Sequence, residues 1–169
     1  MIGTAIVWAG AVGLGGNAMT FPQQGGCACG AVRYSQLGPA LSLQHCHCSR
    51  CRALYGMLCA QGAVIERSKI VIEGEANLAT YYSSPSFDTR FCKTCGCHLF
   101  AYETSEPRLM YFSPATLDGG KHPGHPADKE SHIYVGSKAE WDRFADDLPK
   151  YETSSPDEIV TGLQRTGKP

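Results

Sequence analysis

The chain has 169 residues, which is enough for one domain with a sizeable hydrophobic core and few for two domains of ordinary size. Its 15 Lys and Arg residues balance 16 Asp and Glu residues to a net charge of -1, and no run of five basic residues occurs. This balance argues against an obligatory nucleic-acid partner, because phosphate binding requires a concentrated basic surface.

The N-terminal segment differs from the rest of the chain. Residues 2–16 are apolar and rich in glycine, and no Lys or Arg precedes them. A secretory signal needs a basic start, and a membrane span needs about 20 apolar residues. We therefore expect residues 1–19 to be an extension outside the fold, with the natural start at Met19 and no membrane partner. A signal peptide remains the alternative.

Short extended runs follow, rich in β-branched and aromatic residues and bounded by Gly, Pro or Ser. Eight or nine such strands favour a mainly β fold of twisted antiparallel sheets, with two sheets facing each other. The predicted strands are residues 31–34, 41–43, 58–65, 69–72, 78–83, 87–91, 98–102, 108–112 and 132–135.

Helix signals appear only late in the chain. Ser137–Glu140 and Ser155–Glu158 each have the pattern of a capping box, and Pro156 occupies the favoured first position of the second helix. We predict one or two short C-terminal helices. The folded domain is expected over residues 20–152, and residues 153–169 form a C-terminal tail.

Nine cysteines are unusual for a chain of this length, and their spacing is informative. An odd number in a chain this long is not typical of a secreted disulfide framework, and neither asparagine lies in a glycosylation motif. We interpret the thiols as reduced and metal-bound in a cytoplasmic protein. Seven of them form three groups, namely Cys27 and Cys29, then Cys46, Cys48 and Cys51, then Cys92 and Cys95.

In two of the groups a glycine directly follows the second cysteine, Gly30 in the first and Gly96 in the last. A metal-binding turn usually requires a positive φ just past the ligand, which glycine accepts without steric cost. Two such turns facing each other would supply four thiolates to a tetrahedral zinc ion, with no position left for a substrate. A structural zinc site is therefore predicted at Cys27, Cys29, Cys92 and Cys95.

The third group has no matching glycine. Cys46, Cys48 and Cys51 can occupy one face of a second zinc ion and leave a fourth position open, which is the usual composition of a catalytic site. The chain is thus predicted to bind two zinc ions. Four nearby residues could instead close the second site, namely His45, His47, Cys59 and Cys97.

Three thiolate ligands make zinc a poor activator of water, but such an ion binds a further thiolate well. Sulfur chemistry on a small-molecule thiol is therefore favoured over peptide or phosphate hydrolysis. Arg50, Arg52 and Lys93 lie next to predicted ligands and could offset the negative charge or contact a carboxylated thiol. Each could equally be an ordinary solvated cation.

The remaining candidates are weaker. Cys59 lies in an apolar run and is expected to be a core thiol, and Cys97 is expected to begin a strand. His98 and His132 lie in predicted strands as satisfied polar groups. A Gly/Pro-rich loop could cover a pocket or lie exposed, and a histidine in it could carry a proton. The two histidines of this loop are His122 and His125.

At these motifs the sequence resembles the glutathione-dependent formaldehyde-activating enzyme family, which also includes centromere protein V. The resemblance runs from about Gly25 to Pro156, and the order and spacing of the motifs make it specific. They are Gly25–Tyr34, Cys46–Arg52, Phe91–Phe100, Thr116–Asp118 and His132–Trp141.

The resemblance implies a β-tent-like fold stapled by zinc, with the same partition into four structural and three catalytic cysteines. It also implies a carbon–sulfur lyase that joins formaldehyde to glutathione as S-hydroxymethylglutathione. A non-catalytic zinc module that binds a protein or chromatin partner is the alternative, although the chain has no basic extension to support it. A third hypothesis is a zinc store or redox sensor.

Overall fold

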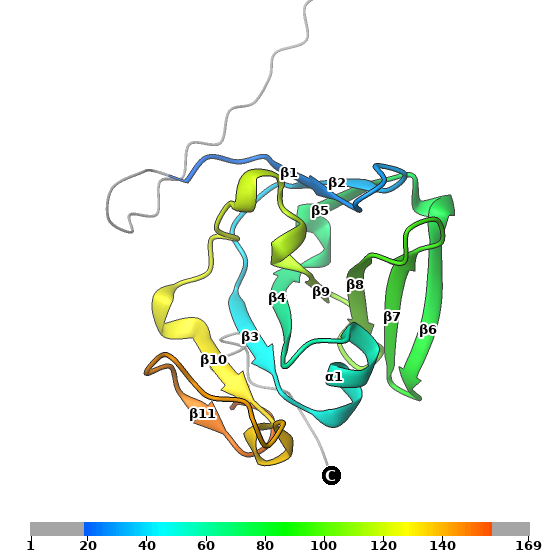
Figure 1. Cartoon of the computed structure of the whole chain (residues 1–169). Helices are drawn as coiled ribbons and strands as arrows, with labels where there is room; N and C mark the ends of the chain where they lie inside the picture. Colours follow the sequence, from blue (N-terminus) through cyan, green and yellow to red (C-terminus); the bar gives the residue numbers. More distant parts are fainter. Residues whose placement is uncertain (1–18, 157–169) are drawn as a thin grey trace, which may run out of the picture.

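A computed structural model describes residues 19–156 and shows two β-sheets and one short helix (Figure 1). The smaller sheet is antiparallel, in the order β1-β2-β5. Its strands are β1 (Gln23–Gly26), β2 (Arg33–Gln36) and β5 (Ile70–Glu73).

The larger sheet has eight strands in the order β11-β10-β3-β4-β9-β8-β7-β6. Its strands are β3 (Ser42–Cys46), β4 (Ala60–Glu66), β6 (Leu78–Ser84), β7 (Phe87–Cys92), β8 (His98–Glu103), β9 (Leu109–Phe112), β10 (Glu130–Ile133) and β11 (Lys150–Tyr151). Each of the nine predicted strands overlaps a strand of one of the two sheets, and the mainly β fold is confirmed. The short β1 and β11 were not predicted.

The main hydrophobic core lies between the two sheets. Tyr34 of β2 is fully buried, and its ring packs edge-on against Phe100 of β8 and Phe112 of β9, with centroid distances of 5.5 and 5.9 Å. The Tyr34 hydroxyl pairs with Thr116 Oγ1 at 2.9 Å. Every second side chain of the strands in both sheets therefore points into one shared core, as the period-2 pattern of apolar residues predicts.

The large sheet is not wholly antiparallel, so the expectation of antiparallel sheets needs one correction. Strand β10 runs parallel to both β3 and β11. In this register His132 lies opposite His45, and Ile133 lies opposite Cys46. A strand from the C-terminal third of the chain is thereby placed against the start of the three-cysteine group.

The only α-helix in the described residues is α1 (Ser49–Tyr55), which was not predicted. Its seven residues are too few to show a clear helical period. Its ends are nevertheless well defined, because Cys48 caps the N-terminus and Gly56, with φ 63°, ends the helix in a left-handed conformation.

The helix predicted from Ser137 does not form. The Ser137 hydroxyl donates to the Tyr134 carbonyl instead of capping a helix, and Asp142 turns inward to a buried histidine. Arg143 donates to the carbonyls of Glu140 and Asp142, so these backbone acceptors are bound by a side chain. The local capping signal is overridden by tertiary contacts. Most of the second predicted helix lies outside the described residues.

Short 3-10 turns connect the strands. They are η1 (Arg67–Lys69), η2 (Glu75–Asn77), η3 (Pro114–Thr116), η4 (Asp118–Gly120), η5 (Ala127–Lys129) and η6 (Val135–Ser137). Between residues 19 and 156, no helix is long and apolar enough to cross a lipid bilayer.

Gly25 gives a testable packing prediction. A Cβ atom built at Gly25 would lie 2.3 Å from Cζ of Tyr34, which is buried and hydrogen-bonded to Thr116. Gly25→Ala is therefore expected to lower the free energy of unfolding by about 1–3 kcal/mol through overpacking, measured by urea denaturation. Gly38→Ala is the control, because its nearest neighbour is the flexible Lys69 side chain at 3.5 Å. Equal stability of Gly25→Ala and wild type would contradict this packing.

Candidate metal centres and the adjoining pocket

The first cysteine group assembles from two turns that are far apart in the sequence. Cys27 and Cys29 lie in the turn between β1 and β2, Cys92 is the last residue of β7, and Cys95 lies in the turn between β7 and β8. All four sulfurs lie within 4.8 Å of one another, with Cys27 to Cys29 at 3.6 Å and Cys29 to Cys92 at 3.7 Å.

Both turns have the predicted backbone shape. Gly30 has φ 78° and Gly96 has φ 72°, which confirms the expectation that glycine is needed past the second cysteine of each turn. The Gly30 amide donates to the Cys27 carbonyl at 3.1 Å, and the Gly96 amide donates to the Cys92 carbonyl at 2.9 Å. The two turns thus present their sulfurs to a common point.

This donor set fits a tetrahedral zinc ion. Four sulfurs at about 2.3 Å from one ion would lie about 3.8 Å apart, close to the spacing in the structure. The nine cysteines, all of them in the described residues, form no disulfide. The Val32 amide also points at Cys27 Sγ, 3.3 Å away, as a donor to a thiolate. The group can therefore hold a metal ion.

The second group lies where β3 passes into α1. Cys46 ends the strand, Cys48 is the N-cap of the helix, and Cys51 lies in its first turn. The Cys51 amide donates to Cys48 Sγ at 3.2 Å, and the sulfurs of Cys46 and Cys51 are 3.4 Å apart. All three sulfurs lie within 4.8 Å of one another, so they too can share one ion.

The close thiols favour ionisation at one of them. The Cys51 thiol stabilises a thiolate at Cys46, which lowers the pKa of Cys46 to about 6. The same contact raises the pKa of Cys51. A cation bound here would take over the role of the shared proton.

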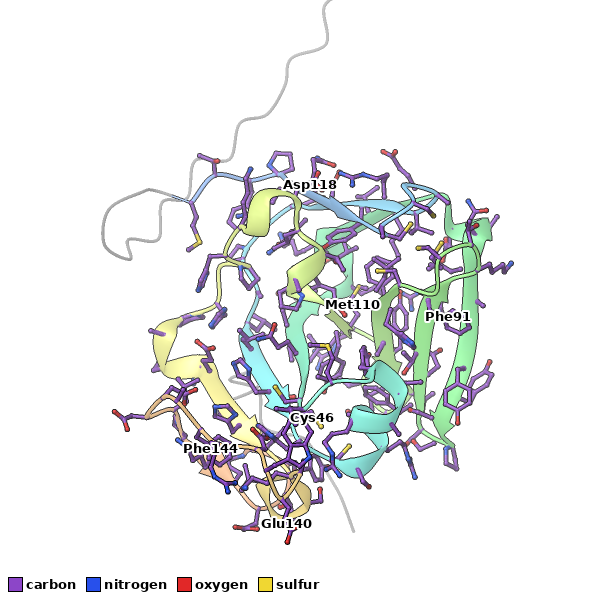
Figure 2. All side chains as sticks on the ribbon, in the orientation of Figure 1. Cys46, Phe91, Met110, Asp118, Glu140 and Phe144 are labelled. Atoms are coloured by element: carbon purple, nitrogen blue, oxygen red, sulfur yellow. The ribbon has the colours of Figure 1, made fainter. Side chains whose placement is uncertain are left out.

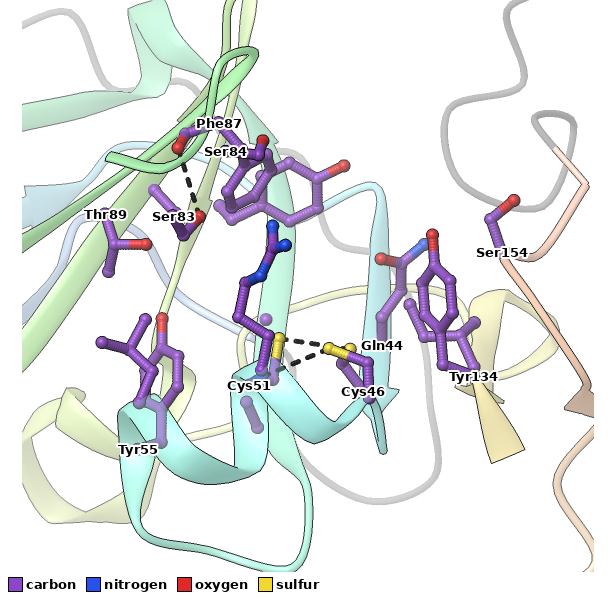
Figure 3. Close-up of a pocket in the computed structure, with 18 of the residues that line it drawn as sticks. Gln44, Cys46, Cys51, Tyr55, Ser83, Ser84, Phe87, Thr89, Tyr134 and Ser154 are labelled. Atoms are coloured by element: carbon purple, nitrogen blue, oxygen red, sulfur yellow. Dashed lines mark hydrogen bonds between the residues drawn. The ribbon is translucent and has the colours of Figure 1, made fainter. Parts of the chain in front are cut away.

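A pocket of about 640 Å³ opens over the three cysteines, a volume within the usual range for a small-molecule site. Figure 3 shows Cys46 and Cys51 on its floor, between Tyr55 on one side and Tyr134 on the other. The β6–β7 hairpin forms a further wall. Its lining residues are Ser83, Ser84, Ser86, Phe87 and Thr89.

His47 lies between two of the cysteines but points away from them. Its Nδ1 pairs with Asp142 Oδ2 at 2.8 Å and its Nε2 pairs with His132 Nδ1 at 2.7 Å, so both ring nitrogens are occupied. Both histidines also pack against Phe144, which Figure 2 shows in the C-terminal segment. Burial lowers the pKa of His47 despite the adjacent carboxylate. His47 therefore anchors the cysteine loop.

The other proposed fourth ligands do not join this group either. His45 Nε2 pairs with Glu130 at 2.8 Å. Cys59 and Cys97 are half-buried free thiols outside both groups. Among residues 19–156, no His, Asp or Glu lies close enough to be counted with either set of sulfurs. The three-cysteine group is therefore open on the pocket side.

The Gly/Pro-rich loop does not line this pocket. His125 is 1% exposed and its Nε2 pairs with Glu130 Oε2 at 3.2 Å, so it is neither an exposed loop residue nor a group over the cysteines. His122 stacks on His125, with ring centroids 4.5 Å apart. The loop therefore does not cover this pocket, because its histidines are held at the Glu130 end of β10.

The three cations next to ligands have different surroundings. Arg52 donates to the His47 carbonyl at 2.9 Å, and Lys93 donates to the Ala76 carbonyl at 2.8 Å. Both side chains therefore form hydrogen bonds with the backbone. Arg50 is exposed, lines the pocket and has no side-chain partner among the described residues. Arg50 alone of the three is available to a ligand in the pocket.

Several pocket residues were not identified from the sequence. Tyr55, Tyr134 and Gln44 reach the pocket through the positions of α1, β10 and β3 rather than through any local motif. Ser155 is buried and accepts a hydrogen bond from Gln44 at 3.1 Å, so the chain packs onto the domain as far as Ser155.

Comparison with known proteins matches residues 22–137 to the family model described as glutathione-dependent formaldehyde-activating enzyme. A Halomonas elongata protein, provisionally named as such an enzyme, is 26% identical over 129 residues, covering 70% of this chain and 78% of that protein. A crystal structure of a Rhodobacter sphaeroides protein is 29% identical and covers 59% of this chain and 91% of its own, with a TM-score of 0.49.

Proposed function

The chain belongs to the glutathione-dependent formaldehyde-activating enzyme family, and we propose that it catalyses the reversible addition of glutathione to formaldehyde as a zinc-dependent lyase of carbon–sulfur bonds. The observation that carries this proposal is the three-cysteine group, whose open side faces a pocket of about 640 Å³. A substrate of small-molecule size fits that space.

The proposal assigns separate roles to the two cysteine groups. Cys27, Cys29, Cys92 and Cys95 would hold a structural zinc ion, and Cys46, Cys48 and Cys51 would hold a catalytic one. When bound at the open group, zinc supplies a position that takes up a thiol sulfur as the thiolate near neutral pH. The domain proposed to carry both ions spans residues 20–152, and the reduced thiols are consistent with a cytoplasmic protein.

The residues of the pocket would bind and orient the two substrates. Arg50 is a free guanidinium at the pocket wall and suits a carboxylate of the tripeptide. The serine-rich β6–β7 hairpin offers hydroxyls to its amide groups. The thiol loses its proton to solvent, the sulfur forms a bond to the aldehyde carbon, and the carbonyl oxygen gains a proton.

The direct test is the rate of exchange between free and adducted glutathione, measured by NMR exchange spectroscopy on protein loaded with two zinc ions. The exchange rate is expected to rise above the uncatalysed rate in proportion to protein concentration, and to return to it when a chelator removes the ion from the open group. A zinc-loaded, folded protein that binds glutathione without accelerating exchange would instead be a non-catalytic binding module.

A further inference from the structure

Tyr134 has an unusual backbone conformation for its residue type. It has φ 56° and ψ 38°, and it is the only non-glycine residue with positive φ in the described part of the chain. A bulky side chain in the left-handed region is strained, and such strain persists only where surrounding contacts impose it. Residues of this kind cluster at functional sites.

The contacts that impose this conformation are present on both sides of Tyr134. Its amide donates to the Thr153 carbonyl at 2.9 Å, and its own carbonyl accepts from the Ser137 amide and hydroxyl, each at 3.2 Å. The preceding residue, Ile133, is in register with Cys46. The turn therefore bends the chain immediately after the strand that borders the three-cysteine group.

The bend places the phenol on the pocket wall. Figure 3 shows Tyr134 beside Gln44, with its hydroxyl end pointing from the level of Cys46 into the pocket. Among residues 19–156, no side chain or backbone group forms a hydrogen bond with this hydroxyl. Partial burial raises the pKa of Tyr134. The hydroxyl is thus a protonated, unpaired donor near the reactive thiols.

The proposed reaction needs a donor at this depth of the pocket. A sulfur held at the open side of the cysteines places the aldehyde carbon one bond farther into the pocket and the oxygen one bond beyond that. As the carbon–sulfur bond forms, the carbon–oxygen double bond becomes a single bond and negative charge develops on oxygen. A hydrogen-bond donor aimed at that oxygen stabilises the transition state more than the ground state.

We propose that the Tyr134 hydroxyl is this donor and is therefore a catalytic residue of the addition step. The assignment rests on the proposed function and deepens it. The phenol donates a hydrogen bond to the developing oxyanion, which then takes a proton from water, and the reverse reaction uses the same hydrogen bond. No further reactant is required, because the proton released by the thiol balances the proton gained by oxygen.

Tyr134→Phe tests the assignment, because it retains the ring and removes only the donor. The expected result is a fall of about 100-fold or more in kcat for adduct exchange, as for the loss of one oxyanion donor. Glutathione affinity by calorimetry, zinc content and melting temperature are expected to match wild type. Tyr82→Phe, on an exposed ring outside the pocket, is the matched control and should change nothing. Tyr55→Phe, on the opposite wall of the pocket, tests whether the Tyr55 hydroxyl donates to the oxyanion instead.

Each outcome decides the assignment. An unchanged kcat in Tyr134→Phe overturns it, as does a larger loss in Tyr55→Phe than in Tyr134→Phe. Equal losses of kcat and of glutathione affinity also overturn it, because the hydroxyl would then bind the thiol substrate rather than the oxyanion. If wild-type protein does not accelerate exchange at all, the proposed function itself fails and this assignment fails with it.

Discussion

Cys95→Ala is expected to prevent stable folding. The four-cysteine group joins two turns whose cysteines are 63 residues apart, and each turn links neighbouring strands of a different sheet. Apparent binding free energies of structural zinc are about 10–16 kcal/mol, as large as the whole stability of an ordinary domain at about 5–15 kcal/mol. Cys95→Ala leaves three ligands at this site, so most of this stabilisation is lost. The buried thiols of Cys27 and Cys92 then lack the zinc ion that they share.

The measurement is the yield of soluble monodisperse protein and its thermal unfolding with zinc in the buffer. Cys59→Ala is the matched control, because Cys59 is a half-buried thiol outside both groups. It is expected to melt cooperatively with two zinc equivalents. A soluble Cys95→Ala protein that melts like wild type would remove the basis for a structural ion at this site.

Cys48→Ala is expected to leave the protein folded while abolishing turnover. The three-cysteine group lies at one end of β3 and its sulfurs connect only residues 46–51, so its metal ties together little of the fold. The zinc content should drop from two equivalents to one, and adduct exchange should fall to the uncatalysed rate. Loss of the N-cap of α1 should cost about 1 kcal/mol of stability.

Cys48→Ser separates the two roles of this residue. A serine hydroxyl can still cap α1, but it is a poor zinc ligand, so stability should be restored while activity remains absent. Metal analysis, thiol titration and urea denaturation of both variants make the comparison. If Cys48→Ala retains two equivalents of zinc and normal turnover, the open site has been assigned to the wrong residues.

The strands and the metal-binding turns could be predicted from the sequence because their signals are local. In a strand that is buried on one face, apolar residues recur at every second position, as they do over Ala31–Tyr34 near β2. Likewise, Gly30 and Gly96 follow their cysteines because the turn itself requires a positive φ. The partition of the sulfurs into groups of four and three agrees with the positions of the side chains.

The walls of the pocket could not be predicted, because they depend on which strands are neighbours. Tyr134 reaches the site only because β10 pairs in parallel with β3, and a parallel pairing of residues 87 apart has no local sequence signal. The same holds for Asp142, which pairs with His47 and so prevents the helix that the Ser137 capping box indicates. Local propensity was outweighed there by one buried hydrogen-bonded pair.

Strand β7 links the two cysteine groups physically. It begins at Phe87 on the pocket wall and ends at Cys92, a distance of roughly 17 Å for six residues in an extended strand. If the remote ion fixes the far end of this strand, then occupancy of that ion and glutathione binding share a coupling free energy. By thermodynamic reciprocity, a bound thiol then raises the affinity for the remote ion by the same factor as the ion raises the affinity for the thiol. A chain that had lost the remote ion would thus bind glutathione more weakly even while its open site was filled.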